Sequence, residues 1–121
     1  MKVSVIIPTH NSEKTLERTL QSVLNQDADC DVEILLCDDH SHDLGWLLKI
    51  ADQYDCKLLR VAGKGGGPNF GRNMGIMNAT GDVIAFLDHD DEWLPGKLKN
   101  QLKEITNGAE FVYSSGITQK V

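Results

Sequence analysis

The stretch at residues 83–94, V-I-A-F-L-D-H-D-D-E-W-L, constrains the fold more than any other part of the chain. Five apolar residues run directly into a segment with four acidic residues, interrupted only by His89. A short apolar run that is rich in β-branched and aromatic residues and bounded by turn and charged residues is typical of a strand buried on both faces of a parallel sheet. Open α/β sheets bind ligands at the carboxyl ends of their strands, so the acidic cluster lies where a binding site is expected.

Strand and helix patterns alternate along the rest of the chain. Short β-branched or apolar runs predict strands at residues 3–7, 32–37, 57–61 and 83–87. Apolar residues at helical spacing predict helices over about residues 13–26, 41–51, 70–80 and 94–105, and residues 111–113 are a further strand candidate. This alternation indicates βαβ units, and therefore an α/β, Rossmann-like fold with a mostly parallel sheet flanked by helices.

The helical spacing also predicts which side chains face the sheet. Ser41 is expected to cap the second helix, because a hydroxyl is a common acceptor for the first helical N–H groups. The residues expected to face inward are Leu16, Leu20, Val23 and Leu24; Leu44, Leu47, Leu48 and Ala51; Phe70, Met74 and Met77; and Leu94, Leu98, Leu102 and Ile105.

Length and composition indicate one globular domain over residues 1–121, with 40% hydrophobic and 25% charged residues. The net charge of -6 argues against nucleic acid as a partner, because phosphate backbones are bound by clustered Lys and Arg. Three cysteines without CxxC spacing or a signal peptide indicate reduced thiols in a cytoplasmic protein, with Cys37 as a small core residue. No apolar run is long enough to span a bilayer.

Polar clusters follow three of the predicted strands, at residues 8–11, 38–39 and 88–92. The carboxyl ends of parallel strands lie at the same edge of a sheet, so these clusters are expected to converge on one rim. The glycine-rich loop at residues 62–69 and Arg72 precede the fourth strand and are placed to fold over that rim. This convergence is a stronger indication of a site than any single motif.

Asp88 and Asp90 have Asp-x-Asp spacing. In an extended segment residues i and i+2 project to the same side, so both carboxylates would face one ligand. Hard oxygen ligands suit Mg²⁺ or Mn²⁺, and such an ion would let a protein of charge -6 hold a diphosphate. A bare Asp-x-Asp is more often a helix cap or a solvated face, but the preceding strand and the other clusters favour a metal site. His89 is expected to point away from the ligand.

Three further features have less specific signals. Asp39 is either an acceptor for a base N–H or a ribose hydroxyl, or a turn residue that caps the next helix. For Asp38 the capping role is favoured. The glycine-rich loop matches neither GxGxxG in its usual context nor GxxxxGK[ST], and a flexible lid explains it equally well. Arg72 is the better candidate for a diphosphate contact, because guanidinium pairs bidentately with phosphate oxygens, although a surface arginine has the same spacing.

The remaining chemistry-bearing residues favour structural roles. His40 and His42 are not at the spacing of a helical ligand pair, and no cysteine lies at a zinc-binding spacing from them. No serine lies in a GxSxG nucleophile elbow. Trp46 and Trp93 are expected to be packing residues.

Four ordered motifs resemble the family 2 inverting glycosyltransferases, which have the GT-A fold. They are V-S-V-I-I-P-T-H-N at 3–11, L-L-C-D-D-H-S at 35–41, G-P-N-F-G-R-N-M-G-I at 67–76 and A-T-G-D-V-I-A-F-L-D-H-D-D-E-W-L-P-G-K-L at 79–98. The resemblance covers nearly the whole chain, and the order and separation of the motifs make it specific.

The resemblance implies a donor site for a nucleoside diphosphate sugar, with a UDP-sugar as the first expectation. It places Pro8 and Thr9 at the base pocket and gives Asp39 the role of holding the base. Arg72 approaches the base or the diphosphate, and Asp88 contacts the ribose side. Asp90 corresponds to the ligand of an Mg²⁺ or Mn²⁺ ion that bridges the phosphates.

Members of the family usually continue well beyond this length and carry the acceptor site and catalytic base in that second half. The chain is therefore expected to be a truncated, donor-binding part, with no catalytic base assigned and with a glycan or lipid-linked acceptor in the full enzyme. The expected location is the cytoplasm, including the inner face of the membrane, and an exposed sheet edge would favour a homo-oligomer. The alternatives are a non-catalytic nucleotide-sugar-binding fragment and a nucleotidyltransferase-like domain.

Overall fold

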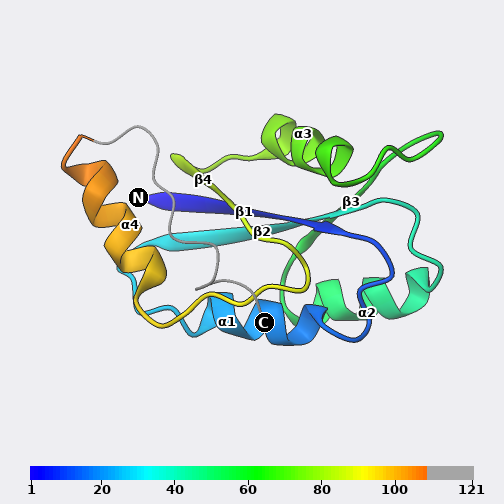
Figure 1. Ribbon diagram of the computed structural model, residues 1–121, viewed down its shortest axis with the longest axis horizontal. Helices are drawn as coiled ribbons and strands as arrows, with labels where there is room; N and C mark the ends of the chain where they lie inside the picture. The colour runs from blue at the N-terminus through cyan, green and yellow to red at the C-terminus, as the bar shows by residue number, and fades with distance from the viewer. Residues whose placement is uncertain (109–121) are drawn as a thin grey trace.

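The computed structural model describes residues 1–108 and contains a four-stranded parallel sheet with the strand order β3-β2-β1-β4 (Figure 1). The sheet confirms the α/β class predicted from the alternation of patterns. The predicted strand at residues 111–113 lies outside the described part of the chain. The elements are β1 (Lys2–Thr9), α1 (Leu16–Leu24), β2 (Asp31–Asp38), α2 (Leu44–Gln53), β3 (Lys57–Arg60), α3 (Pro68–Asn78), β4 (Val83–Phe86) and α4 (Lys97–Thr106).

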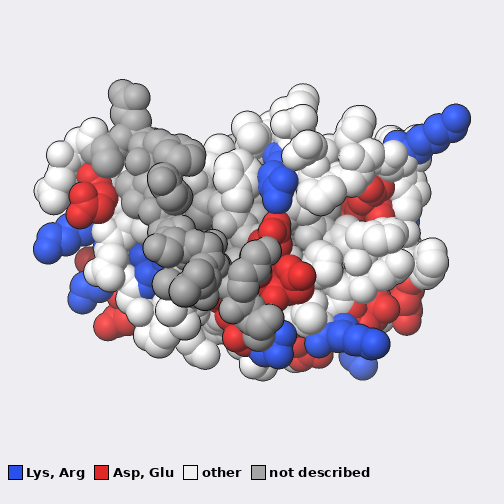
Figure 2. Space-filling model, viewed as in Figure 1, with Lys and Arg blue, Asp and Glu red and all other residues white. Residues whose placement is uncertain are grey.

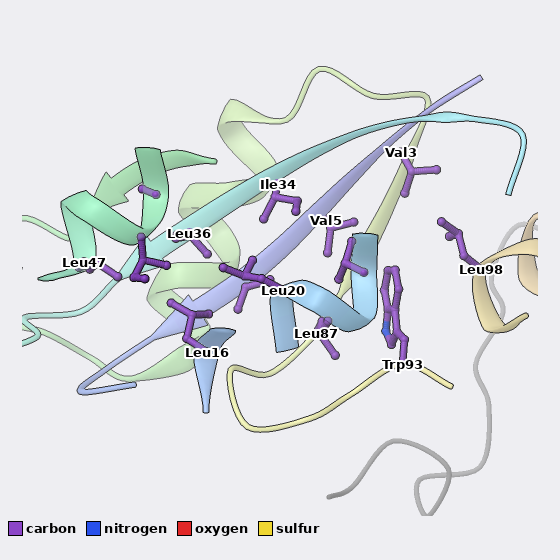
Figure 3. Close-up of a cluster of buried hydrophobic side chains, with 14 residues drawn as sticks. Val3, Val5, Leu16, Leu20, Ile34, Leu36, Leu47, Leu87, Trp93 and Leu98 are labelled. Atoms are coloured by element: carbon purple, nitrogen blue, oxygen red, sulfur yellow. The ribbon is translucent and has the colours of Figure 1, made fainter. Parts of the chain in front are cut away.

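Helices cover both faces of the sheet. Figure 1 shows α1 and α2 on one face, α3 on the other and α4 at one end. Alternate residues of β1 face the two layers, as the period of two in a strand requires. Val3, Val5 and Ile7 enter the larger core beneath α1 and α2, whereas Ile6 enters a smaller core beside α3. Figure 3 shows the larger core, in which Trp93 and Leu98 close the end nearest α4.

The prediction that the fourth strand is buried on both faces is wrong. β4 lies at the edge of the four-stranded sheet and pairs with β1. Its residues Val83 and Ala85 pack against the larger core, but Ile84 and Phe86 on the opposite face are 39% and 48% exposed. Helix α3 packs mainly over β1 and β2, so it leaves this part of the sheet only partly covered.

Helices α1 and α2 bury most, but not all, of the predicted faces. In α1, Leu16, Leu20 and Val23 are buried as predicted, whereas Leu24 is exposed. In α2, Leu47 and Ala51 are buried together with Ile50, whereas Leu48 is exposed and Leu44 is half-buried. The N-cap of α2 is Asp43, whose side chain accepts a hydrogen bond from the Trp46 N–H at 3.0 Å, so the prediction that Ser41 caps this helix is wrong.

Helix α3 contacts the sheet through glycines rather than through the large side chains that were predicted. Gly71 and Gly75 are its buried residues, whereas Phe70 and Met77 are exposed and Met74 is partly buried against the sheet. A Cβ atom at Gly75 would lie 2.6 Å from Ile6 Cγ2. The helix backbone therefore approaches the sheet more closely than any side chain at this position would allow.

Helix α4 begins later than predicted. The segment from Trp93 to Gly96 is not helical, and Leu94 within it is half exposed rather than inward. Leu98 is buried, and Leu102 packs partly buried against the larger core. No helix within residues 1–108 has the length and hydropathy needed to cross a membrane.

At the amino end of the sheet, Glu33 joins three segments. Its carboxylate accepts hydrogen bonds from the Ser4 hydroxyl, the Lys57 ammonium and both the N–H and the hydroxyl of Thr80. Burial opposes ionisation of this group, but the hydrogen bonds from Ser4, Thr80 and Lys57 outweigh it and hold the pKa of Glu33 well below its usual range.

Candidate functional site

The carboxyl ends of three strands meet at one cavity, as the sequence predicts. The cavity has a volume of about 370 Å³. Its walls come from the end of β1, the segment after β2, the start of α3 and the segment after β4, which lie far apart in the sequence. The lining residues are Pro8, Thr9, His10, Cys37, Asp39, Gly67, Pro68 and His89. The cavity therefore includes Pro8, Thr9 and Asp39 among the predicted site residues.

A fully buried carboxylate, Asp38, fixes the ends of the strands at this cavity. It accepts hydrogen bonds from Thr9 Oγ1 at 2.8 Å, from the Ser41 N–H at 3.0 Å and from the Ser41 hydroxyl. Arg60 Nε of β3 lies 3.2 Å from Asp38 Oδ2. Asp38 therefore ties together β1, β2, β3 and the loop after β2, a larger role than the helix cap favoured from the sequence.

The backbone N–H, the backbone carbonyl and both carboxylate oxygens of Asp39 all make hydrogen bonds. Its N–H donates to the Thr9 carbonyl at 2.9 Å, and its own carbonyl lies 2.6 Å from His10 Nδ1. One carboxylate oxygen lies 2.7 Å from His40 Nδ1, and the other accepts from the Gly67 N–H at 2.9 Å. The hydrogen bond from His40, followed by that from Gly67, lowers the pKa of Asp39, so the side chain is an ionised acceptor at neutral pH.

The glycine-rich loop lies against Asp39. The Gly67 N–H binds the carboxylate, and a Cβ atom at Gly65 would lie 1.9 Å from Asp39 Oδ1. A side chain at residue 65 would displace the Asp39 carboxylate, so glycine allows the loop backbone to approach this closely. The loop therefore lies at the rim, as the sequence predicts.

The acidic segment after β4 forms a turn rather than the extended segment that was assumed. The Asp91 N–H donates to the Asp88 carbonyl at 3.1 Å. The turn gathers carboxylate oxygens of Asp88, Asp90 and Asp91 within 4.8 Å of one another, and Asp90 is exposed whereas Asp91 is buried. Three hard oxygen donors fit Mg²⁺ or Mn²⁺. Sequence reasoning left Asp91 unassigned, because its position depends on the turn.

Arg72 of α3 reaches the acidic turn. Its Nη2 atom lies 2.9 Å from Asp88 Oδ1, and its Nη1 atom donates to Asn69 Oδ1 at 3.2 Å. Both charged side chains stay partly exposed, at 34% for Arg72 and 41% for Asp88. The structure therefore brings together two residues whose predicted roles are at neighbouring parts of one ligand.

His89 is among the residues that line the cavity, and its side-chain Nδ1 atom lies 3.3 Å from Thr15 Oγ1, next to the start of α1. Its carbonyl accepts a hydrogen bond from Thr19 Oγ1 of α1 at 2.9 Å, which anchors the turn to the helix.

Two core predictions are confirmed. Cys37 is fully buried, and burial raises the pKa of its thiol to about 11, which makes it a packing residue rather than a nucleophile. Trp93 is buried in the larger core. Figure 2 shows Lys and Arg side chains interspersed with Asp and Glu on one face, without a continuous basic surface among the described residues in view.

The sequence matches the model of glycosyl transferase family 2 over residues 4–120. It is 35% identical over 124 aligned positions to the GalNAc(5)-diNAcBac-PP-undecaprenol beta-1,3-glucosyltransferase of Campylobacter jejuni, an alignment that covers 98% of this chain and 39% of that protein. The chain therefore spans about two fifths of the length of this relative.

Solved glycosyltransferase structures share the fold. Residues 1–349 of Staphylococcus aureus TarS in complex with UDP-GlcNAc match with a TM-score of 0.76 and 27% identity, over 95% of this chain and 38% of that one. The mannosyltransferase PcManGT of Pyrobaculum calidifontis, in complex with GDP-Man and Mn²⁺, matches with a TM-score of 0.69 and 26% identity, over 84% of this chain and 31% of that one. The chain belongs to glycosyl transferase family 2 and has the corresponding part of the GT-A fold.

Proposed function

We propose that the chain is the donor-binding part of an inverting glycosyltransferase that takes a nucleoside diphosphate sugar, with a UDP-sugar as the expected donor. The observation that carries this proposal is the cavity at which the segments following β1, β2 and β4 meet. Its volume of about 370 Å³ lies in the range of small-molecule sites. The complexes of TarS with UDP-GlcNAc and of PcManGT with GDP-Man support a nucleotide sugar as the ligand.

The base would lie in the cavity, between the end of β1 and Asp39. Pro8 and Thr9 supply a wall from β1, and the Thr9 hydroxyl is already committed to Asp38, which leaves its methyl group and main chain for the ligand. The ionised carboxylate of Asp39 would accept an N–H of the base, because each carboxylate oxygen retains a lone pair beyond its bonds to His40 or Gly67.

The ribose and diphosphate would lie toward the acidic turn. Asp88 is half exposed and suited to accept ribose hydroxyls, and Arg72 is the cation beside it that would contact the diphosphate. The Arg72–Asp88 ion pair keeps both side chains at the edge of the site, although neither lines the cavity itself. This position supports roles at the phosphate end rather than at the base.

Asp90, with Asp88 and Asp91, would hold the divalent ion, Mg²⁺ or Mn²⁺. When bound, the ion would supply positive charge that stabilises the departing diphosphate. The Mn²⁺ in the PcManGT complex supports this assignment. Asp90 is the most accessible of the three carboxylates and is proposed as the principal ligand.

The acceptor is proposed to be a glycan or a lipid-linked saccharide, so the full protein would work at the inner face of the cytoplasmic membrane. The undecaprenol-linked substrate in the name of the Campylobacter jejuni relative supports a lipid-linked acceptor. Direct displacement at the anomeric carbon needs a base on the acceptor hydroxyl. Neither Asp91 nor Glu92 is assigned this role, because Asp91 is buried within the turn and Glu92 pairs with Arg18 at 3.0 Å.

Calorimetric titration of the 121-residue chain with UDP and with GDP tests the proposal. Binding of at least one nucleotide is expected with Mn²⁺ present, and the affinity should fall when the ion is chelated. Absence of heat with either nucleotide under both conditions would contradict the proposal. A donor hydrolysis assay then separates a catalytic unit from a purely binding module, because only the former consumes the donor.

A further inference from the structure

His40, the residue after Asp39, has an uncommon backbone conformation. Its φ angle is 58°, in the left-handed region where a side chain costs free energy and glycine does not. Non-glycine residues in such conformations concentrate at ligand-binding sites, where the surrounding structure supports the strain. A histidine at position 40 therefore costs conformational free energy that a glycine would not.

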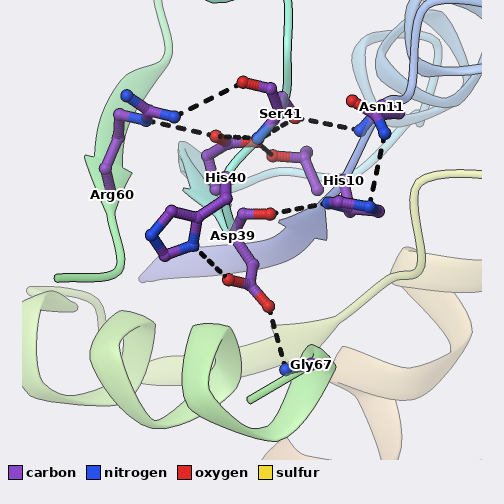
Figure 4. A network of polar contacts seen from close by, with 9 residues as sticks. His10, Asn11, Asp39, His40, Ser41, Arg60 and Gly67 are labelled. Atoms are coloured by element: carbon purple, nitrogen blue, oxygen red, sulfur yellow. Dashed lines mark hydrogen bonds and ion pairs between the residues drawn. The ribbon is translucent and has the colours of Figure 1, made fainter. Parts of the chain in front are cut away.

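The imidazole of His40 turns back onto the preceding residue. Figure 4 shows its ring beside the Asp39 carboxylate, with the Gly67 N–H on the other carboxylate oxygen. An ionised carboxylate can only accept, so His40 Nδ1 carries the hydrogen of the 2.7 Å bond. The side chain otherwise remains 46% exposed, and a contribution to the hydrophobic core does not explain it.

A second imidazole holds the main chain of the same aspartate. The Asp39 carbonyl can only accept, so His10 Nδ1 donates to it at 2.6 Å. The remaining ring nitrogen of His10 is then free to accept from Asn11 Nδ2 at 3.3 Å. The hydrogen-bond directions in the network are mutually consistent, and they leave the rotation of the Asp39 carboxylate to be fixed by His40 and Gly67.

We propose that His40 is a positioning residue for nucleotide recognition, which holds the Asp39 carboxylate in the orientation that accepts an N–H of the base. The inference rests on the proposed function, because it assumes that Asp39 binds the base. Gly67 belongs to the glycine-rich loop, whereas His40 is adjacent to Asp39 in the chain, so His40 keeps one carboxylate oxygen fixed whatever position the loop adopts.

This role predicts different effects of one substitution on stability and on binding. His40→Gly removes both the left-handed strain and the hydrogen bond to Asp39, and these two contributions to stability oppose each other, so the thermal midpoint should stay close to that of the wild type. The same change frees the Asp39 carboxylate to rotate. Loss of a hydrogen bond to a charged group should then weaken UDP binding about tenfold. A residue that only supports the fold would lose stability and affinity together.

The test measures affinities for UDP and for inorganic pyrophosphate, both with Mn²⁺, by calorimetry. His40→Gly should weaken UDP about tenfold and leave pyrophosphate, which has no base, unchanged. His40→Asn should restore UDP affinity to within about threefold, because asparagine tolerates the left-handed region and its amide nitrogen corresponds to Nδ1. Asp55→Gly is the matched control, since Asp55 has the same left-handed backbone but follows α2 and does not line the cavity, and both affinities should be unchanged.

A double-mutant cycle with Asp39→Asn completes the test. If His40 acts through the carboxylate, His40→Gly should have no further effect on UDP affinity in the Asp39→Asn background. Unchanged UDP affinity in His40→Gly, or equal losses for UDP and pyrophosphate, would overturn the inference. If wild-type protein binds neither UDP nor GDP, the proposed function itself fails, which is a different result from normal UDP binding that is indifferent to residue 40.

Discussion

Asp38 offers a quantitative test of how the strand ends are held at the cavity. Its carboxylate is fully buried and has four partners: the Thr9 hydroxyl, the N–H and the hydroxyl of Ser41, and Arg60 Nε. Asp38→Ala removes all four interactions and leaves buried donors without an acceptor. At about 1 kcal/mol for each hydrogen bond, the free energy of unfolding should fall by about 4 kcal/mol.

Asp38→Asn should have about half this effect. The amide oxygen can replace Oδ1 as the acceptor for the hydroxyls of Thr9 and Ser41. The amide nitrogen would then occupy the position of Oδ2 and face two donors, the Ser41 N–H and Arg60 Nε. Two of four interactions are lost, so the expected decrease is about 2 kcal/mol.

Urea unfolding followed by circular dichroism measures both values, with an unchanged m-value as evidence that the same transition is compared. UDP affinity with Mn²⁺ should also fall in both variants, because Asp38 holds the segments that carry Thr9 and Asp39. A loss of less than about 1 kcal/mol for Asp38→Ala would refute the hydrogen-bond accounting used to derive these magnitudes.

Three further predictions concern other parts of the molecule. Gly75→Ala should destabilise the fold by about 1–3 kcal/mol, because the added Cβ would lie 2.6 Å from Ile6 of the sheet. Gly45→Ala should stabilise α2 by about 0.5–1 kcal/mol, because its Cβ would have no neighbour nearer than 3.7 Å. Urea unfolding of both variants checks the two signs. Because the pKa of Glu33 is lowered in the folded state, this carboxylate stabilises the fold fully above its unfolded pKa of about 4.3, and the stabilisation is lost as the pH falls toward the folded pKa. The urea midpoint of Glu33→Gln should therefore depend less on pH below pH 5 than the midpoint of the wild type. Parallel curves for the two proteins would contradict this. Asp90→Asn should weaken the binding of UDP with Mn²⁺ at least about tenfold, with little change in the free energy of unfolding. Asp82→Asn, at the opposite end of β4, is the control and should leave binding unchanged. Equal calorimetric affinities for the two variants would show that Asp90 is not a metal ligand.

The sheet and its binding edge were predictable from local patterns. β-branched runs separated by helical spacing define parallel strands, and the carboxyl ends of such strands coincide whatever the details of packing. For this reason Pro8, Thr9 and Asp39 were correctly expected at one rim, where the structure places them around a single cavity.

The failures share a different origin, because they depend on what covers each element. Apolar residues at β4 predicted burial on both faces, but β4 is at the sheet edge and Phe86 is half exposed. A leucine at helical spacing does not show how wide the buried stripe is, so Leu24 and Leu48 were placed inward incorrectly. The clustering of Asp91 with Asp88 and Asp90 depends on a turn that Asp-x-Asp spacing alone does not specify.

Nuclear magnetic resonance of the ¹⁵N-labelled chain tests the central claim, that a nucleotide and a divalent ion bind together at the carboxyl end of the sheet. With UDP and Mg²⁺, the amide signals of Thr9, Asp39 and Gly67 should shift, while those of Glu33 at the amino end stay in place. Replacing Mg²⁺ by Mn²⁺ should broaden the signals of residues 88–91 before all others. Shifts and broadening centred at the amino end, or no change on adding both ligands, would contradict the proposed site.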